Sequence, residues 1–226
     1  MSKNLFVVGT GTDVGKTFVT GLILKKLRDL GKNAAYYKAA MSGNNRRPDG
    51  SLIPGDALFV KTVSGICEPL SEMCPYVYET AVSPHLASRL EGNTPRLPVI
   101  EEGFFALSRY EYLTMEGSGG ILCPLSMDDS PLWLEDVIQA LHLPCVLVAD
   151  GGLGTINGVV LTVAYMREKN IPLKGIIFNR FQRGNVLHED NLEVCRKMTG
   201  LPVLACVQER DMELSISPEL LLSLYE

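Results

Sequence analysis

Short runs of apolar residues alternate along this chain with segments whose apolar residues recur at helical spacing. The apolar runs at 4–8, 34–38, 112–116, 145–150, 174–179 and 202–207 have the length and composition of strands. Helical periodicity lies between them, for example at 16–30, 99–110, 131–141 and 188–198, and residues 128–130 are expected to cap the third of these. About seven strands alternating with helices predict an α/β fold, a mostly parallel β-sheet with helices on both faces.

The first apolar run leads directly into a glycine-containing loop, residues 9–17, which opens into the first helix. In such a unit, consecutive backbone N–H groups face one concavity, and the positive end of the helix dipole points into it. The unit is therefore suited to bind phosphate. Lys16 is placed to reach terminal phosphates, and the Thr17 hydroxyl is placed to ligate Mg²⁺. Five residues separate Gly9 from Gly15, one more than usual. The loop predicts nucleoside triphosphate binding and a phosphate-loop NTPase-like fold.

Two of the predicted strands end in a carboxylate that is followed by glycines. Glu116 precedes a glycine-rich run at 117–120, and Asp150 precedes two glycines at 151–152. Phosphate-loop enzymes place a second contact to Mg²⁺ at such a strand end, where glycines let the backbone approach the phosphates. The pattern favours neither carboxylate, so both are candidates.

Further polar side chains stand where predicted elements begin or end. Lys38 and Ser42 follow the second strand, at the edge where parallel sheets bind ligands, although a solvated lysine is the simpler interpretation. Asp56 precedes a helical run and is either a site carboxylate or a partner of the helix dipole. Asn179 ends another strand and either pairs with a base edge or stabilises a turn.

Composition restricts the class of protein. A chain of 226 residues with 46% hydrophobic content suits one domain, residues 1–226. Its net charge of −5 and the lack of a basic stripe disfavour nucleic acid as a partner. No run approaches the roughly 20 apolar residues that span a bilayer, so we expect no membrane partner and a cytoplasmic protein. The six cysteines show no metal-ligand spacing and are expected to be reduced, mostly buried thiols.

Taken together, these segments resemble the dethiobiotin synthetase family. The resemblance covers most of the chain in order and rests on residues 9–17, 37–43, 55–57, 83–85, 116–120, 153–157 and 179. The long phosphate loop is itself typical of this family. Ala39 departs from the family pattern, which commonly has proline after the lysine, and so does 205–208, where relatives usually carry Gly and Pro near the base. The preference for ATP over other nucleotides therefore stays open.

The resemblance implies an ATP-dependent cyclo-ligase of biotin biosynthesis. One amine of 7,8-diaminononanoate captures CO2 or bicarbonate carbon, ATP phosphorylates the carbamate, and the second amine closes the cyclic urea of dethiobiotin with loss of phosphate. ATP is then the co-substrate and Mg²⁺ the cofactor. Relatives are homodimers, so the resemblance also implies a homodimer, with Asn157 near the partner subunit.

The same resemblance implies a role for each site residue. Lys38 resembles the active-site lysine that stabilises the carbamate, and Lys16 would hold the transferring phosphoryl group. By the family pattern the acidic ligand is Glu116 and not Asp150. The implied metal ligands are Thr17, Asp56 and Glu116, and the implied substrate contacts are Thr12, Ser42 and Asn157. The implied nucleotide-binding residues are Asp13, Val14, Gly15, Lys16, Thr17, Phe18, Asp56, Glu116, Gly117, Ser118, Gly119 and Asn179.

Two other functions share this fold. A partitioning or assembly ATPase has a related long loop, but it typically carries a signature lysine early in that loop, where this chain has residues 10–12, Thr-Gly-Thr. An amide-forming ligase acting on a larger cofactor precursor is disfavoured because the chain has no added glutamine-hydrolysing domain. An assay with the diamine separates all three functions.

Overall fold

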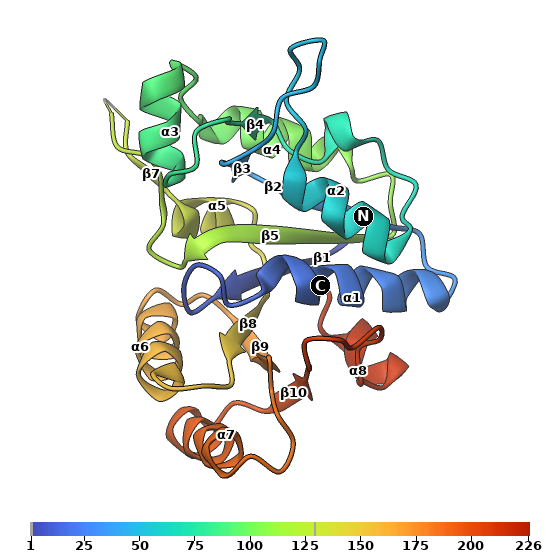
Figure 1. Ribbon diagram of the computed structural model, residues 1–226, viewed down its shortest axis with the longest axis vertical. Coiled ribbons are helices and arrows are strands. Elements are labelled where there is room, and N and C mark those ends of the chain that lie inside the picture. Colours follow the sequence, from blue (N-terminus) through green and yellow to red (C-terminus); the bar gives the residue numbers. More distant parts are fainter. Residues whose placement is uncertain (1, 129) are drawn as a thin grey trace.

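The computed structural model describes residues 2–128 and 130–226 of the chain (Figure 1). The strands are β1 (Lys3–Gly9), β2 (Ala34–Lys38), β3 (Ala40–Met41), β4 (Tyr76–Val77), β5 (Tyr112–Gly120), β6 (Pro124–Ser126), β7 (Leu132–Trp133), β8 (Cys145–Asp150), β9 (Leu173–Asn179) and β10 (Val203–Cys206). The helices are α1 (Lys16–Asp29), α2 (Gly55–Ser64), the 3-10 turn η1 (Leu70–Glu72), α3 (Pro84–Glu91), α4 (Leu97–Ala106), α5 (Leu134–Ala140), α6 (Thr155–Glu168), α7 (Val186–Thr199) and α8 (Pro218–Ser223).

A central sheet organises the molecule. Its strand order is β10-β9-β8-β1-β5-β2, and every neighbouring pair is parallel, which confirms the predicted fold class. In the described part of the chain this sheet has six strands, against the prediction of about seven. The short strands β3 and β4, and β6 and β7, form two separate two-stranded sheets. Because the six strands are parallel, their carboxyl ends meet at one edge, where ligands bind in open α/β sheets.

Helices cover both faces of this sheet, because successive side chains of a strand point to opposite sides. Leu5 and Val7 of β1 are buried in one cluster with residues of α1, α2 and α8. Phe6 and Val8 are buried in a second cluster with residues of α4, α5, α6 and α7. In Figure 1, α2, α1 and α8 follow one another across the first face. Burial on both faces explains why β1 reads as a continuous apolar run.

Three predicted elements have different bounds in the structure. The helix expected at 131–141 begins only at Leu134, because the Trp133 backbone N–H donates to Asp136 Oδ2 (2.7 Å) and fixes the helix start there. The capping predicted from Asp128 and Ser130 is therefore wrong, and Asp129, the third residue of that prediction, lies outside the described residues. The helix expected at 99–110 spans 97–106, with Pro98 in its first turn. Strand β5 continues past Glu116 through the glycines to Gly120.

Two other predictions concern the whole chain. All six cysteines are free thiols, of which Cys74, Cys145 and Cys195 are buried and Cys67 is exposed. Among the residues described, no helix has both the length and the apolar content that crossing a membrane requires.

Candidate active site

The phosphate loop joins β1 to α1, and its shape depends on a contact from β9. Gly15 is the N-cap of α1 with φ of 89°, a left-handed conformation that side chains rarely adopt. The Asn179 side chain donates from Nδ2 to the Val14 carbonyl (3.0 Å) and lies so close that a Cβ at Gly15 would stand 1.9 Å from it. Only glycine fits this turn, and Asn179 holds the loop from behind.

Lys16 begins α1 and turns back over the loop. Its Nζ donates to the Gly11 carbonyl (2.7 Å), and the side chain is buried. Burial, with the positive charge of Lys38, lowers the pKa of Lys16 to about 8, although Glu116 partly opposes the shift. The ammonium group therefore lacks sufficient compensating negative charge, which a bound phosphate would supply.

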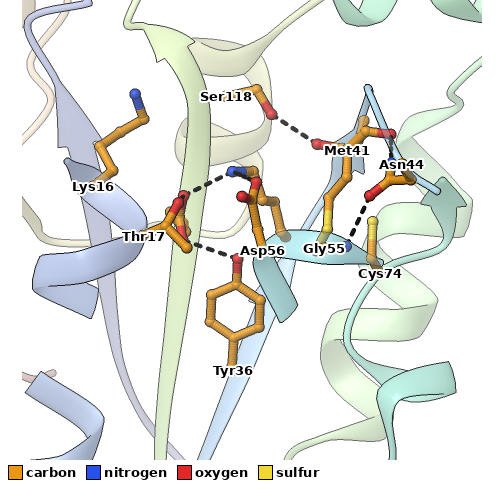
Figure 2. Close-up of polar contacts among 12 residues, drawn as sticks. Lys16, Thr17, Tyr36, Met41, Asn44, Gly55, Asp56, Cys74 and Ser118 are labelled. Atoms are coloured by element: carbon orange, nitrogen blue, oxygen red, sulfur yellow. Dashed lines mark hydrogen bonds and ion pairs between the residues drawn. The ribbon is translucent and has the colours of Figure 1, made fainter. Parts of the chain in front are cut away.

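A buried ion pair joins β2 to β5. Lys38 is the register partner of Glu116, so both side chains project on the same side of the sheet. Lys38 Nζ donates to Glu116 Oε1 (2.7 Å) and to Asp56 Oδ2 at the start of α2 (2.7 Å). Thr17 bonds to Glu116 and Asp56 to Lys38, and Figure 2 shows Thr17 and Asp56 close together above the Tyr36 ring. Three separate elements thus contribute to one charged cluster.

Electrostatics keep this cluster charged. Burial opposes the charge of Lys38, but Glu116 and Asp56 outweigh it and hold the pKa of Lys38 above its ordinary value. Burial likewise opposes the charge of Asp56, whose side chain is partly exposed, and Lys38 holds the pKa of that carboxyl below its ordinary value. Because each charge faces an opposite one, the cluster satisfies the requirement that buried charges be paired.

Thr17 connects the phosphate loop to this cluster. Its hydroxyl donates to Glu116 Oε1 (2.8 Å), which leaves the lone pairs of the Thr17 oxygen directed elsewhere and free for a cation. With Asp56 and Glu116 it forms a set of oxygen donors, which Mg²⁺ prefers, and Mg²⁺ commonly takes one or two carboxylates and completes its shell with phosphate oxygens. The residues present therefore fit Mg²⁺ bound together with a nucleotide.

Tyr36 lies beneath the cluster. Its hydroxyl donates to Glu116 Oε2 (2.9 Å), and the whole side chain is buried. Burial, and next the charge of Glu116, raises the pKa of this hydroxyl well above its ordinary value, so it keeps its proton and acts as a donor. Glu116 thus receives bonds on both oxygens, from Thr17 and Lys38 on one and from Tyr36 on the other.

A cleft of about 840 Å³ opens above these groups at the carboxyl ends of the strands. Its lining brings together most of the residues predicted from the sequence, from the phosphate loop, from the ends of β2 and β5 and from the start of α2. These are Thr12, Asp13, Gly15, Lys16, Thr17, Phe18, Lys38, Ser42, Asp56, Glu116, Ser118 and Gly119.

Other predicted residues lie outside the lining that the structure describes. Val14 belongs to the loop itself, and its carbonyl accepts from Asn179, which holds the loop from behind. Gly117 faces the core, because a Cβ there would meet Leu134 and Phe6. Asn157 is exposed on the first turn of α6.

The two candidate carboxylates are placed differently. Glu116 is fully buried beside Thr17. Asp150 instead pairs through Oδ2 with Arg180 (2.9 Å) and accepts from the Gly152 backbone N–H at Oδ1 (2.8 Å). Glu116 is therefore the carboxylate that shares the cluster with Lys38.

Sequence reasoning missed several residues at the site, four of which bear on its chemistry. Phe59, Cys123 and Arg180 line the cleft, and Tyr36 lies below it. A signal for Tyr36 was present: in a strand, residues two apart share a face, so Tyr36 lies on the same side as Lys38. No comparable pattern marked the other three, because they come from a helix and two loops distant in sequence.

The parallel sheet, the glycine turn before α1 and the buried lysine of that turn define a phosphate-loop nucleotide-binding protein. Residues 3–213 match the family model described as an AAA domain.

The chain belongs to the ATP-dependent dethiobiotin synthetase family. It is 43% identical over 209 residues to the ATP-dependent dethiobiotin synthetase BioD of Brachyspira hyodysenteriae, with 92% of each chain covered. The protein of that name from Clostridium novyi is 47% identical over 209 residues, covering 92% of this chain and 87% of the relative. A third, from Clostridium botulinum, is 41% identical over 227 residues, covering 100% of this chain and 99% of the relative.

Solved structures support the fold alone. The MinC:MinD cell division protein complex of Aquifex aeolicus aligns with a TM-score of 0.58 at 12% identity, covering 92% of this chain and 82% of that one. The septum site-determining protein MinD of Pyrococcus horikoshii, complexed with Mg-ADP, aligns with a TM-score of 0.50 at 16% identity, covering 99% and 86%.

Proposed function

We propose that this protein is a dethiobiotin synthetase, which converts 7,8-diaminononanoate, CO2 and ATP to dethiobiotin, ADP and phosphate in biotin biosynthesis. The observation that carries the proposal is the cluster of Lys16, Lys38, Asp56 and Glu116 in one cleft of a chain whose relatives bear that name. Phosphoryl transfer needs positioned positive charge more than covalent chemistry, and two lysines face this cleft.

The reaction begins when one amine nitrogen attacks the CO2 carbon, a C–N bond forms and the nitrogen loses a proton to give a carbamate. Lys38 is the group that we assign to this step, because its ammonium is held charged at the cleft wall and stabilises the carbamate anion. Ser42, in the same lining, offers a hydroxyl to orient the diamine.

A carbamate oxygen then attacks the γ-phosphorus of ATP, the bond to the β-phosphate oxygen breaks and ADP leaves. Lys16 balances the charge that develops on the transferring group, and the backbone of the phosphate loop holds the remaining phosphates. The second amine next attacks the carbamate carbon and loses a proton, and the C–O bond to phosphate breaks. A cyclic urea and phosphate result, and the two protons lost by the amines pass to solvent.

Mg²⁺ is assigned to Thr17, Asp56 and Glu116. When bound, it supplies positive charge that neutralises phosphate oxygens during transfer. Asp13, Val14, Gly15, Phe18, Gly117, Ser118, Gly119 and Asn179 are proposed as the remaining nucleotide-binding residues, through the loop backbone and its supports. Thr12 and Ser42 are proposed contacts of the diamine within the cleft.

We further propose a cytoplasmic homodimer formed by a single domain, residues 1–226. Free thiols suit a reducing compartment. Leu153 and Asn157, both exposed at the start of α6, are the surface that we assign to the partner subunit, where Asn157 would contact the substrate bound by the other chain. Light scattering that returned the mass of one chain would contradict the dimer.

Product identification tests the function. Purified protein is incubated with ATP, Mg²⁺, ¹³C-bicarbonate and 7,8-diaminononanoate, and the products are analysed by mass spectrometry. The expected product is a cyclic urea that carries the label. Steady ATP hydrolysis that is indifferent to the diamine, with no cyclic urea, would overturn the proposal in favour of a nucleotide-gated ATPase.

A further inference from the structure

We propose that Tyr36 is a positioning residue that fixes the carboxylate of Glu116 for Mg²⁺ and nucleotide binding. The proposal rests on the function proposed above, since it deepens the role of the same site. Tyr36 does not line the cleft, and it acts only through Glu116.

The strand geometry places Tyr36 where it can do this. Tyr36 and Lys38 lie two residues apart in β2 and so project from the same face of the sheet, the one that α1 and α2 cover. The Tyr36 backbone is also fixed, because its N–H donates to the buried Glu68 Oε2 (2.7 Å). A fully buried ring on a fixed strand leaves the hydroxyl one position, at 2.9 Å from Glu116 Oε2.

The hydrogen bond removes a freedom that Glu116 otherwise has. Thr17 and Lys38 both bond to Oε1, and bonds to one oxygen leave the carboxylate plane free to turn about its last torsion, which has a broad energy profile. Tyr36 holds the second oxygen and thereby sets the plane. Because Thr17 donates to the same carboxylate, the direction of the Thr17 lone pairs is set with it. Groups that orient metal ligands in this way commonly change metal affinity when they are removed.

The neighbouring residue provides a matched control. Tyr37 is also fully buried in β2, but it projects to the opposite face, where its hydroxyl donates to the Ile100 carbonyl (2.9 Å). Tyr36→Phe and Tyr37→Phe each remove one buried hydroxyl and one hydrogen bond from the same strand. They differ in whether the lost bond reaches Glu116.

The test measures binding of a fluorescent ADP analogue during Mg²⁺ titration, together with thermal unfolding and steady-state kinetics. We expect both variants to fold, and Tyr36→Phe alone to require about tenfold more Mg²⁺ for half-maximal binding. We also expect Tyr36→Phe to lower kcat while leaving the KM for the diamine close to that of the unchanged protein.

Several outcomes would overturn the proposal. Equal effects of the two variants on Mg²⁺ dependence would show a merely structural role, and so would an unchanged Mg²⁺ requirement in Tyr36→Phe. Nucleotide binding to the unchanged protein that ignores Mg²⁺ would also overturn it. The binding measurement needs no diamine, so a protein that makes no cyclic urea yet shows the shift would contradict the proposed function and leave the role of Tyr36 standing.

Discussion

At the scale of single residues, the two lysines of the site differ in how their charges are paired. Lys38 is matched by Asp56 and Glu116, whereas among the described residues Lys16 bonds only to a neutral carbonyl in its loop. The lowered pKa of Lys16 reflects this difference, because burial is the main cause and the nearest cation adds to it. Lys16 is therefore the group whose charge a triphosphate completes.

Replacement of Lys16 by alanine tests this role. Lys16→Ala should fold, because Lys16 forms no ion pair with the residues that the structure describes. It should nevertheless lower kcat/KM by a factor on the order of 10²–10³, or about 3–4 kcal/mol, since a preorganised charge is removed from the transferring phosphate. Steady-state kinetics and circular dichroism measure the two quantities. Unchanged turnover would show that the phosphate loop does not serve the reaction.

The two strand-end carboxylates are expected to differ sharply. Glu116→Gln removes the charge beside Thr17 and Lys38, whereas Asp150→Asn removes one that pairs with Arg180. A Mg²⁺ titration of activity should therefore shift far more for Glu116→Gln. If Asp150→Asn shifts the titration more, the metal contact belongs to β8 and the assignment to β5 is wrong.

At the scale of elements, the edge of the sheet is closed by a loop. Strand β2 is the edge strand, and the segment after α2 covers it: Glu68 accepts the Tyr36 N–H, and the Met73 carbonyl accepts the Lys38 N–H (2.9 Å). Glu68 is fully buried, and its Oε1 has no partner among the described residues. The same loop thus covers the edge of the sheet, which would otherwise be exposed, and fixes the strand that carries Lys38.

Glu68 makes stability depend on pH. Burial raises the pKa of Glu68 to about 8, although the Tyr36 N–H bond and the charges of Arg109 and Lys61 partly oppose the shift. The folded state therefore holds a proton that the unfolded chain releases near its ordinary value of 4.5, so the stability from this group is full below that value and is lost as pH rises through about 8. Urea unfolding of Glu68→Gln should show a flatter decline toward alkaline pH than the unchanged protein. An identical decline in both would contradict the assignment.

Local patterns predicted the elements better than their ends. The continuous apolar run of β1 and the glycine turn after it predicted the sheet and the loop, because burial on both faces and phosphate binding each demand a distinctive composition. The start of α5 was mispredicted because Asp136 caps the helix from within. Arg180 was missed because only the strand order decides which strand ends meet in space. Tyr36 shares a face with Lys38, but its bond to Glu116 depends on the pairing of β2 with β5.

At the scale of the whole molecule, the strand order brings residues from distant segments to one edge. Placing β1 between β5 and β8 puts the phosphate loop beside the end of β5, and β2 then adds Lys38 on the far side of Glu116. Resemblance to a family supplied what spacing alone left open, namely the choice of Glu116 over Asp150. The geometry agrees with that choice, since Glu116 bonds to Thr17 whereas Asp150 bonds to Arg180 and the Gly152 N–H.

The stoichiometry of a single reaction mixture tests the central claim most directly. ADP, phosphate and dethiobiotin are measured together while 7,8-diaminononanoate is titrated at fixed ATP, Mg²⁺ and bicarbonate. A synthetase that passes through a phosphorylated carbamate predicts equal amounts of all three products and ADP formation that rises from near zero with the diamine. ADP released in excess, at a rate independent of the diamine, would contradict the claim.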